Sequence, residues 1–144
     1  MTNQELRQDL FNRSLAHLRQ QGKPAVFTVD TRDPINCWYR SPEGCSCAVG
    51  GMIKDEFYSA EYEGETVEDF RVLEALANSL EVDLDHFNKD IENFLTDLQA
   101  SLHDDFVSSG LDVGEKHFPT WLEQQAEGFA QSYNLNFPAK EIQA

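Results

Sequence analysis

The sequence predicts an α+β domain that is mainly α, with four or five helices packed together and a small β-hairpin-like element near residues 26–41. Apolar residues recur at three- and four-residue spacing over most of the chain, which is typical of amphipathic helices. One short run, 25–29, instead carries the residue types of a strand. The 144 residues can build one hydrophobic core, and no linker or low-complexity stretch divides them, so we expect a single globular domain over 1–144.

The first helix is predicted over residues 3–21. Thr2 or Asn3 has the side chain of a helix N-cap, and Gly22 with Pro24 ends the helical pattern. The expected buried stripe consists of Leu6, Leu10, Phe11, Leu15 and Leu18.

The next segment is expected to pair two short strands, 25–29 and 37–40, across the turn-rich stretch 30–34. After a second turn at 41–44, small and apolar residues predict a short buried helix that begins at Ser46 or Cys47 and reaches Ile53.

The second half is expected to be helical. Thr66 and Asp69 resemble a capping box ahead of a helix whose apolar stripe runs from Phe70 to Leu80. A longer helix is predicted over 83–102, a break over 104–114, and a last helix over 116–133.

The charge is strongly negative and uneven, with a formal net charge of -15. Residues 1–40 hold six basic and four acidic residues, whereas residues 41–144 hold five basic and twenty-two acidic ones. Such a surface repels nucleic acid, so direct nucleic-acid binding is not expected. The charge serves either solubility or an acidic face that occupies a basic groove on a partner protein.

The chain shows no apolar run long enough to cross a bilayer, and its start lacks the pattern of a secretory signal. We therefore expect no membrane partner and a location in the cytoplasm of a bacterium or of a phage-infected cell. Three cysteines are too few for a disulfide framework.

Residues 37–64 contain a pattern at the positions Cys37, Tyr39, Arg40, Gly44, Cys47, Ala48, Val49, Gly50, Ile53, Asp55, Glu56, Tyr58, Glu63 and Gly64. This pattern resembles a family of small proteins from bacteriophages, prophages and bacteria. Later matches are Leu98-Gln99 with His103-Asp104, and Trp121 in the last helix. The resemblance implies a phage-type or bacterial cytoplasmic protein and implies no activity.

A thiol-dependent hydrolase or transferase is one chemical alternative. Cys47 at the start of a helix would be the nucleophile, His103 its base, and Asp104 or Asp105 the group that orients the imidazole. A buried cysteine in a packed core is the competing interpretation. The cysteine and histidine spacings do not match a zinc site, so we expect no metal and no cofactor.

Arg40 offers a second alternative, a nucleotide or small-anion site with stacking from Trp38 and Tyr39. Its competing interpretation is a structural ion pair with Asp55 or Glu56.

The leading hypothesis is a non-enzymatic interaction protein of phage or prophage type that binds a basic surface on another protein, for instance as an inhibitor of a host nucleic-acid-handling or defence factor. The predicted contact residues lie on the acidic face of the 83–102 helix: Asp83, Asp85, Asp90, Glu92 and Asp97. The sequence does not determine the oligomeric state.

Overall fold

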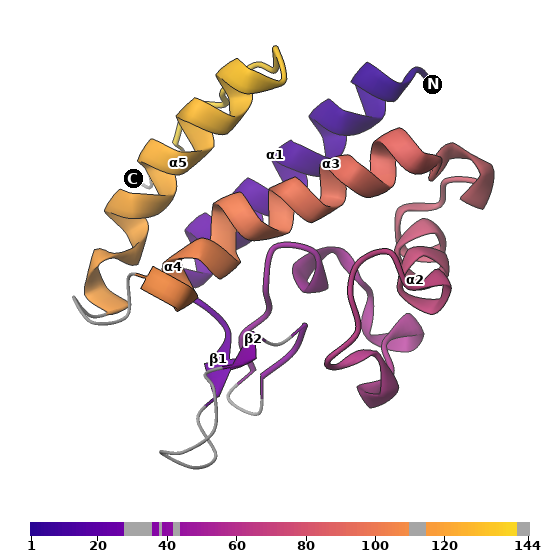
Figure 1. Cartoon of the computed structure of the whole chain (residues 1–144), viewed down its shortest axis with the longest axis horizontal. Helices are drawn as coiled ribbons and strands as arrows, with labels where there is room; N and C mark the ends of the chain where they lie inside the picture. The colour runs from indigo at the N-terminus through magenta and orange to yellow at the C-terminus, as the bar shows by residue number, and fades with distance from the viewer. Residues whose placement is uncertain (28–35, 38, 42–43, 110–114, 141–144) are drawn as a thin grey trace.

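The computed structural model describes residues 1–27, 36–37, 39–41, 44–109 and 115–140, and these are mainly helical. Helices α1 (Asn3–Gln21), α3 (Lys89–Gln99) and α5 (Phe118–Ser132) lie side by side, and α2 (Phe70–Leu80) packs beside them together with several single 3₁₀ turns (Figure 1). The mainly helical prediction is confirmed.

Two short strands, β1 (Val26–Phe27) and β2 (Asn36–Cys37), pair antiparallel, with Val26 opposite Cys37. The residues that would join them, 28–35, and the neighbouring Trp38 lie outside the described residues. The hairpin-like element over 26–41 as a whole therefore stays a prediction.

Helix α1 has the ends that the sequence predicts. The Thr2 hydroxyl accepts the Glu5 backbone N–H at 3.1 Å, and the Glu5 carboxylate accepts the Thr2 N–H at 3.3 Å, which completes a capping box. Gly22 ends the helix in the left-handed region, at φ 74°. The predicted stripe on α1 is buried: Leu6, Leu10, Phe11, Leu15 and Leu18.

Two helices begin later than predicted. Helix α2 starts at Phe70, whose N-terminal neighbour Asp69 caps it by accepting the Arg71 N–H at 2.8 Å. Phe70 itself remains 62% exposed, so its predicted place in the buried stripe is wrong. Helix α3 starts at Lys89 because the Asn88 side chain caps it through the Ile91 N–H at 3.1 Å.

The single helix predicted over 83–102 is therefore wrong at its start. Leu84–His86 forms a separate 3₁₀ turn, and Glu81, at φ 58°, ends α2 in the left-handed region. The predicted break over 104–114 is also partly wrong, because α4 (Asp105–Ser109) is helical. The helix predicted from Ser46 or Cys47 is reduced to one 3₁₀ turn, Gly50–Met52.

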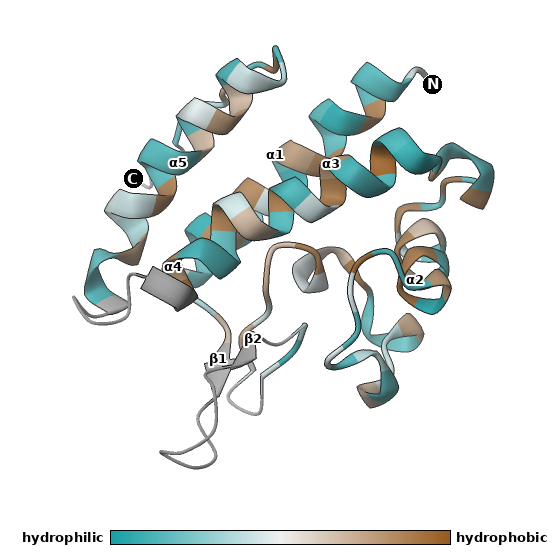
Figure 2. Ribbon diagram, viewed as in Figure 1, coloured by the Kyte–Doolittle hydropathy of each residue, from teal (hydrophilic) through white to brown (hydrophobic). Residues whose placement is uncertain are grey.

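The core lies where α1, α3 and α5 meet and continues under the segment 47–53. Hydrophobic and hydrophilic residues alternate along α3 (Figure 2), and the inward ones, such as Phe94 and Leu98, are fully buried. The C-terminal segment 133–140 follows α1, where the Gln4 and Gln8 side chains donate to its backbone carbonyls. Within the described residues, no helix is both long and apolar enough to span a bilayer.

Candidate functional site

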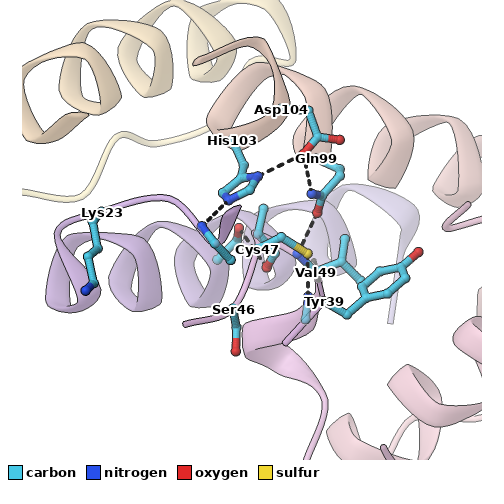
Figure 3. A network of polar contacts seen from close by, with 12 residues as sticks. Lys23, Tyr39, Ser46, Cys47, Val49, Gln99, His103 and Asp104 are labelled. Atoms are coloured by element: carbon cyan, nitrogen blue, oxygen red, sulfur yellow. Dashed lines mark hydrogen bonds and ion pairs between the residues drawn. The ribbon is translucent and has the colours of Figure 1, made fainter. Parts of the chain in front are cut away.

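A π-helical turn, Ala100–Asp104, joins α3 to α4 and builds the polar centre of the molecule. This wider turn brings Gln99 and Asp104, five positions apart, into contact: the Gln99 amide donates to Asp104 Oδ1 at 2.8 Å. A π turn interrupts the regular hydrogen-bond pattern of an α-helix, and such turns are frequent at functional sites. Figure 3 shows the resulting cluster of side chains from the π turn, from α3 and from the segment before Gly50.

The His103 ring is held in one tautomer by its two partners. Its Nε2 accepts the Ala25 backbone N–H at 2.8 Å, and its Nδ1 lies 2.8 Å from Asp104 Oδ1. Because a backbone N–H only donates, Nε2 is the unprotonated nitrogen and Nδ1–H donates to the carboxylate. Both ring nitrogens are therefore engaged, and His103 is fully buried.

Gln99 connects this centre to the segment that contains Cys47. Its amide oxygen accepts the Val49 N–H at 2.9 Å, while the Gly50 N–H donates to Cys47 Sγ at 3.3 Å (Figure 3). Sequence reasoning named His103 and Asp104 but gave no role to Gln99 or Ala25. The signal for Gln99 was its place in the Leu98-Gln99 motif; nothing local pointed to Ala25.

The Cys47 thiol is kept protonated by its surroundings. The residue is only 2% exposed, and burial raises the pKa of its thiol to about 12. The Gly50 N–H opposes this shift, whereas the Asp104 carboxylate adds to it. Cys47 also precedes the 3₁₀ turn instead of opening a helix, so the expected help from a helix N-terminus is missing.

Two of the three residues of the thiol alternative, His103 and Asp104, are in direct contact, and Cys47 lies nearby in the same cluster. The pair is joined in the order that a catalytic triad needs, but the nitrogen that would take the thiol proton already accepts the Ala25 N–H. This arrangement favours a structural role for all three side chains.

We therefore expect slow alkylation of native Cys47 by iodoacetamide. Raising a thiol pKa from 9.0 to about 12 lowers the thiolate fraction at neutral pH roughly a thousandfold, before burial restricts access further. The rate should rise as the pH rises toward that pKa. Mass spectrometry of the Cys47 peptide measures it, with the guanidinium-unfolded chain as the reactive control. Rapid native labelling near neutral pH would contradict the buried thiol.

Arg40 is engaged by the protein itself. Its guanidinium donates to the Asp55 carboxylate and to the Ile53 carbonyl, and it lies 4.6 Å from the centre of the Tyr58 ring. The predicted ion pair with Asp55 is confirmed. Trp38, the expected stacking partner, lies outside the described residues, so the anion-binding alternative gains no support from this geometry.

The Glu63 carboxylate connects the backbone of Tyr39 and Arg40 to the Tyr58 side chain. One carboxylate oxygen accepts the Tyr39 N–H at 2.9 Å, and the other accepts the Arg40 N–H at 3.1 Å and the Tyr58 hydroxyl. The residues of the 37–64 pattern thus bond mainly to one another, which is what a folding signature requires. Tyr39 is 6% exposed and packs against the core.

The predicted acidic face is divided. Asp83 and Asp85 lie in the turn before α3, and Asp90 lies in its first turn. Glu92 lies 3.8 Å from the Lys89 ammonium, and Asp97 accepts the Tyr133 hydroxyl. The prediction that these five acids share one helical face is wrong, because α3 begins only after the first two of them.

Within the described residues, no group of three or more histidine, cysteine or acidic side chains has the arrangement of a metal site. Comparisons with protein-family models, with curated proteins and with solved structures gave no match for this chain.

Proposed function

We propose that this chain is a non-enzymatic, acidic interaction protein of phage or prophage type, which binds a basic surface on another protein in the bacterial cytoplasm. One observation carries the proposal: the exposed side chains of Asp83, Asp85 and Asp90 have no basic partner among the described residues. We call these three residues the acidic end. Unneutralised exposed carboxylates near one another attract a cationic surface.

The basic residues of the chain do not offset this charge. Three arginines form ion pairs with acids outside the acidic end: Arg19 with Glu123 at 2.7 Å, Arg40 with Asp55, and Arg71 with Asp69 at 3.2 Å. These three arginines are therefore engaged by acids of the chain itself, and the formal net charge of the chain remains -15.

The partner class that best matches this acidic surface is a protein that binds nucleic acid in a basic groove. Such grooves are built to hold rows of phosphates, and a set of exposed carboxylates competes for the same cations. The resemblance of the 37–64 segment to phage and prophage proteins supports a host protein as the target, with inhibition of a nucleic-acid-handling or defence factor as the consequence.

The test replaces the acidic end with its amides, as Asp83→Asn, Asp85→Asn and Asp90→Asn together. The matched control, Glu56→Gln, Glu74→Gln and Glu127→Gln, removes the same charge at three other exposed positions. The probes are purified bacterial DNA- and RNA-binding proteins with basic clefts, and the assay follows release of a labelled duplex by fluorescence anisotropy. We expect the triple-amide variant to compete at least about tenfold more weakly than the control.

Salt supplies the second readout. Competition by the wild-type chain should fall steeply between about 50 mM and about 500 mM NaCl, because exposed charge pairs are screened. Equal competition by both triple variants, or competition that persists in the higher salt, would overturn the proposal.

A further inference from the structure

The segment 135–140, which we call the strap, runs back along α1 after α5 has ended (Figure 1). The Gln8 side chain holds it as a neighbouring strand would: its nitrogen donates to the Asn136 carbonyl at 3.0 Å, and its oxygen accepts the Asn136 N–H at 2.8 Å. Arg19 donates to the Pro138 carbonyl at 3.0 Å. Side chains of α1 therefore bind the backbone of the strap, as a receptor binds an extended peptide. We call this part of α1 the strap groove.

Two side chains of the strap fit it to this groove. The Arg19 guanidinium lies 5.3 Å from the centre of the Phe137 ring, which is a cation–π contact. Pro138 biases Phe137 toward an extended backbone and has no N–H that would need a partner. The free strap is therefore already close to its bound shape, which lowers the entropy lost on binding.

The strap is attached less firmly than the helices. None of its residues is buried: Leu135 and Pro138 are half-buried, and the other four are exposed. At its far end a hollow of about 790 Å³ remains between the strap and α1, bordered by Ala16, Gln20 and Lys140 among others. Segments with few buried apolar contacts open at a lower free energy than the core does. The strap therefore opens while the core of α1, α3 and α5 stays folded.

A single tight reversal connects α5 to the strap. The Asn134 N–H donates to the Gln131 carbonyl at 3.3 Å, and the Leu135 N–H donates to the Ala130 carbonyl at 2.8 Å, which closes α5 in a Schellman motif. Asn134 has φ 56°, in the left-handed region that residues with a β-carbon rarely adopt and asparagine tolerates. The conformation of this one residue therefore decides whether the strap folds back onto its own α1.

We propose that two copies of this chain exchange their straps, so that the strap of each copy lies in the strap groove of the other. The same contacts re-form in such a dimer. Within one molecule the effective concentration of the strap is about millimolar, so the closed monomer prevails in dilute solution. The exchanged surfaces lack the acidic excess of the chain, because α1 has three arginines against two acids and the strap has one charged residue, Lys140. The acidic end takes no part, so this inference and the proposed function can fail independently.

Asn134→Pro tests the reversal. Proline holds φ near about -65°, which excludes the left-handed conformation, so the strap leaves its own groove and pairs with a second copy. Asn134→Gly is the matched control, because glycine adopts positive φ freely and keeps the reversal. Sedimentation velocity between about 1 µM and about 1 mM measures the dimer, and we expect Asn134→Pro to dimerise at least about tenfold more tightly than the wild type or Asn134→Gly.

The groove is tested in the same background. Adding Gln8→Ala to Asn134→Pro removes both bonds to the strap backbone and should weaken the dimer about tenfold or more. Gln125→Ala, at an exposed glutamine on α5, should leave the dimer unchanged. In a dimer of one labelled and one unlabelled copy, isotope-filtered NOEs should connect the Phe137 ring of one copy to the Arg19 side chain of the other.

A peptide measurement does not depend on the proline variant. A blocked peptide with the sequence of residues 134–140 is titrated onto the full chain that carries Phe137→Ala, whose own strap has lost its contact with Arg19. Amide NMR shifts should show binding about fivefold tighter than to the wild type. Phe70→Ala, which removes another exposed aromatic ring, should bind the peptide no more tightly than the wild type does.

Four results would each overturn the exchange. They are an Asn134→Pro chain that stays monomeric at about 1 mM, an Asn134→Gly chain that dimerises as tightly as Asn134→Pro, a dimer that Gln8→Ala does not weaken, and a peptide that binds Phe137→Ala no more tightly than the wild type.

Discussion

Replacing His103 with alanine is expected to lower the free energy of unfolding by about 3–5 kcal/mol. The substitution leaves the Ala25 N–H without its acceptor and takes the Nδ1–H donor away from Asp104. It also opens a cavity next to Phe118, whose ring meets the imidazole edge-on at 6.5 Å. Urea denaturation, with the midpoint and the slope both recorded, measures the loss.

The matched control is His117→Ala, because His117 is exposed and its side chain makes no cap bond to α5. A surface change of this kind shifts stability by no more than about 0.5 kcal/mol. A His103→Ala variant within about 1 kcal/mol of the wild type would show that the imidazole does not join the segment before β1 to the π turn.

The tautomer of His103 gives an independent readout that does not depend on unfolding. Long-range ¹⁵N–¹H NMR spectra should show a proton on Nδ1 and an unprotonated Nε2, since Nε2 accepts the Ala25 N–H. The opposite tautomer would contradict the hydrogen-bond assignment, whatever the stability of the variants.

The elements whose signals are local were predictable from the sequence. Helix α1 needs only Thr2, Glu5 and Gly22 to define its ends, and the structure has all three in those roles. The start of α3 was missed because Leu84 and Phe87 continue the apolar spacing of the helix backwards, while the side chain of Asn88 provides a cap that competes with it.

The polar centre was predictable only in part, because only some of its signals are local in the sequence. His103 and Asp104 stand out in sequence as adjacent polar residues at the end of an apolar stripe. Their partners come from far along the chain: Ala25 is 78 residues away from His103, and Val49 is 50 residues away from Gln99. The π turn follows from these tertiary bonds, so a pattern of 3.6-residue periodicity could not reveal it.

The segment 47–53 illustrates how tertiary contact overrides a local pattern. Its small apolar residues predicted a helix, yet the only regular helical element in it is the 3₁₀ turn Gly50–Met52. The carbonyl of Cys47 accepts the Gly51 N–H at 3.1 Å, and the thiol accepts the Gly50 N–H, so the chain turns tightly at the point where it meets Tyr39. The glycines serve this close approach and not a longer helix.

Gly50→Ala is expected to lower the free energy of unfolding by about 3 kcal/mol or more. A Cβ at this position would lie 2.1 Å from the carbonyl oxygen of Tyr39 and 2.8 Å from its Cα, so the new methyl group meets backbone. Tyr39 has little room to retreat, since its N–H bonds Glu63 at 2.9 Å and its hydroxyl donates to the Glu65 carbonyl at 2.7 Å.

Two other glycines turn this prediction into an ordered series. At Gly51 an added Cβ would lie 2.2 Å from the His17 ring and would displace its contact with the Ser46 carbonyl. Because a side chain shifts more readily than the backbone, Gly51→Ala should cost less than Gly50→Ala. At Gly128, within α5, nothing lies within 4 Å, and alanine should stabilise the helix by about 0.5–1 kcal/mol.

Urea midpoints should therefore rank Gly128→Ala first, then the wild type, Gly51→Ala and Gly50→Ala. The order tests the close approach of Gly50 to Tyr39, because of the three substitutions the one at Gly50 alone places a Cβ against backbone atoms. A Gly50→Ala variant as stable as Gly128→Ala would mean that the two backbones do not meet.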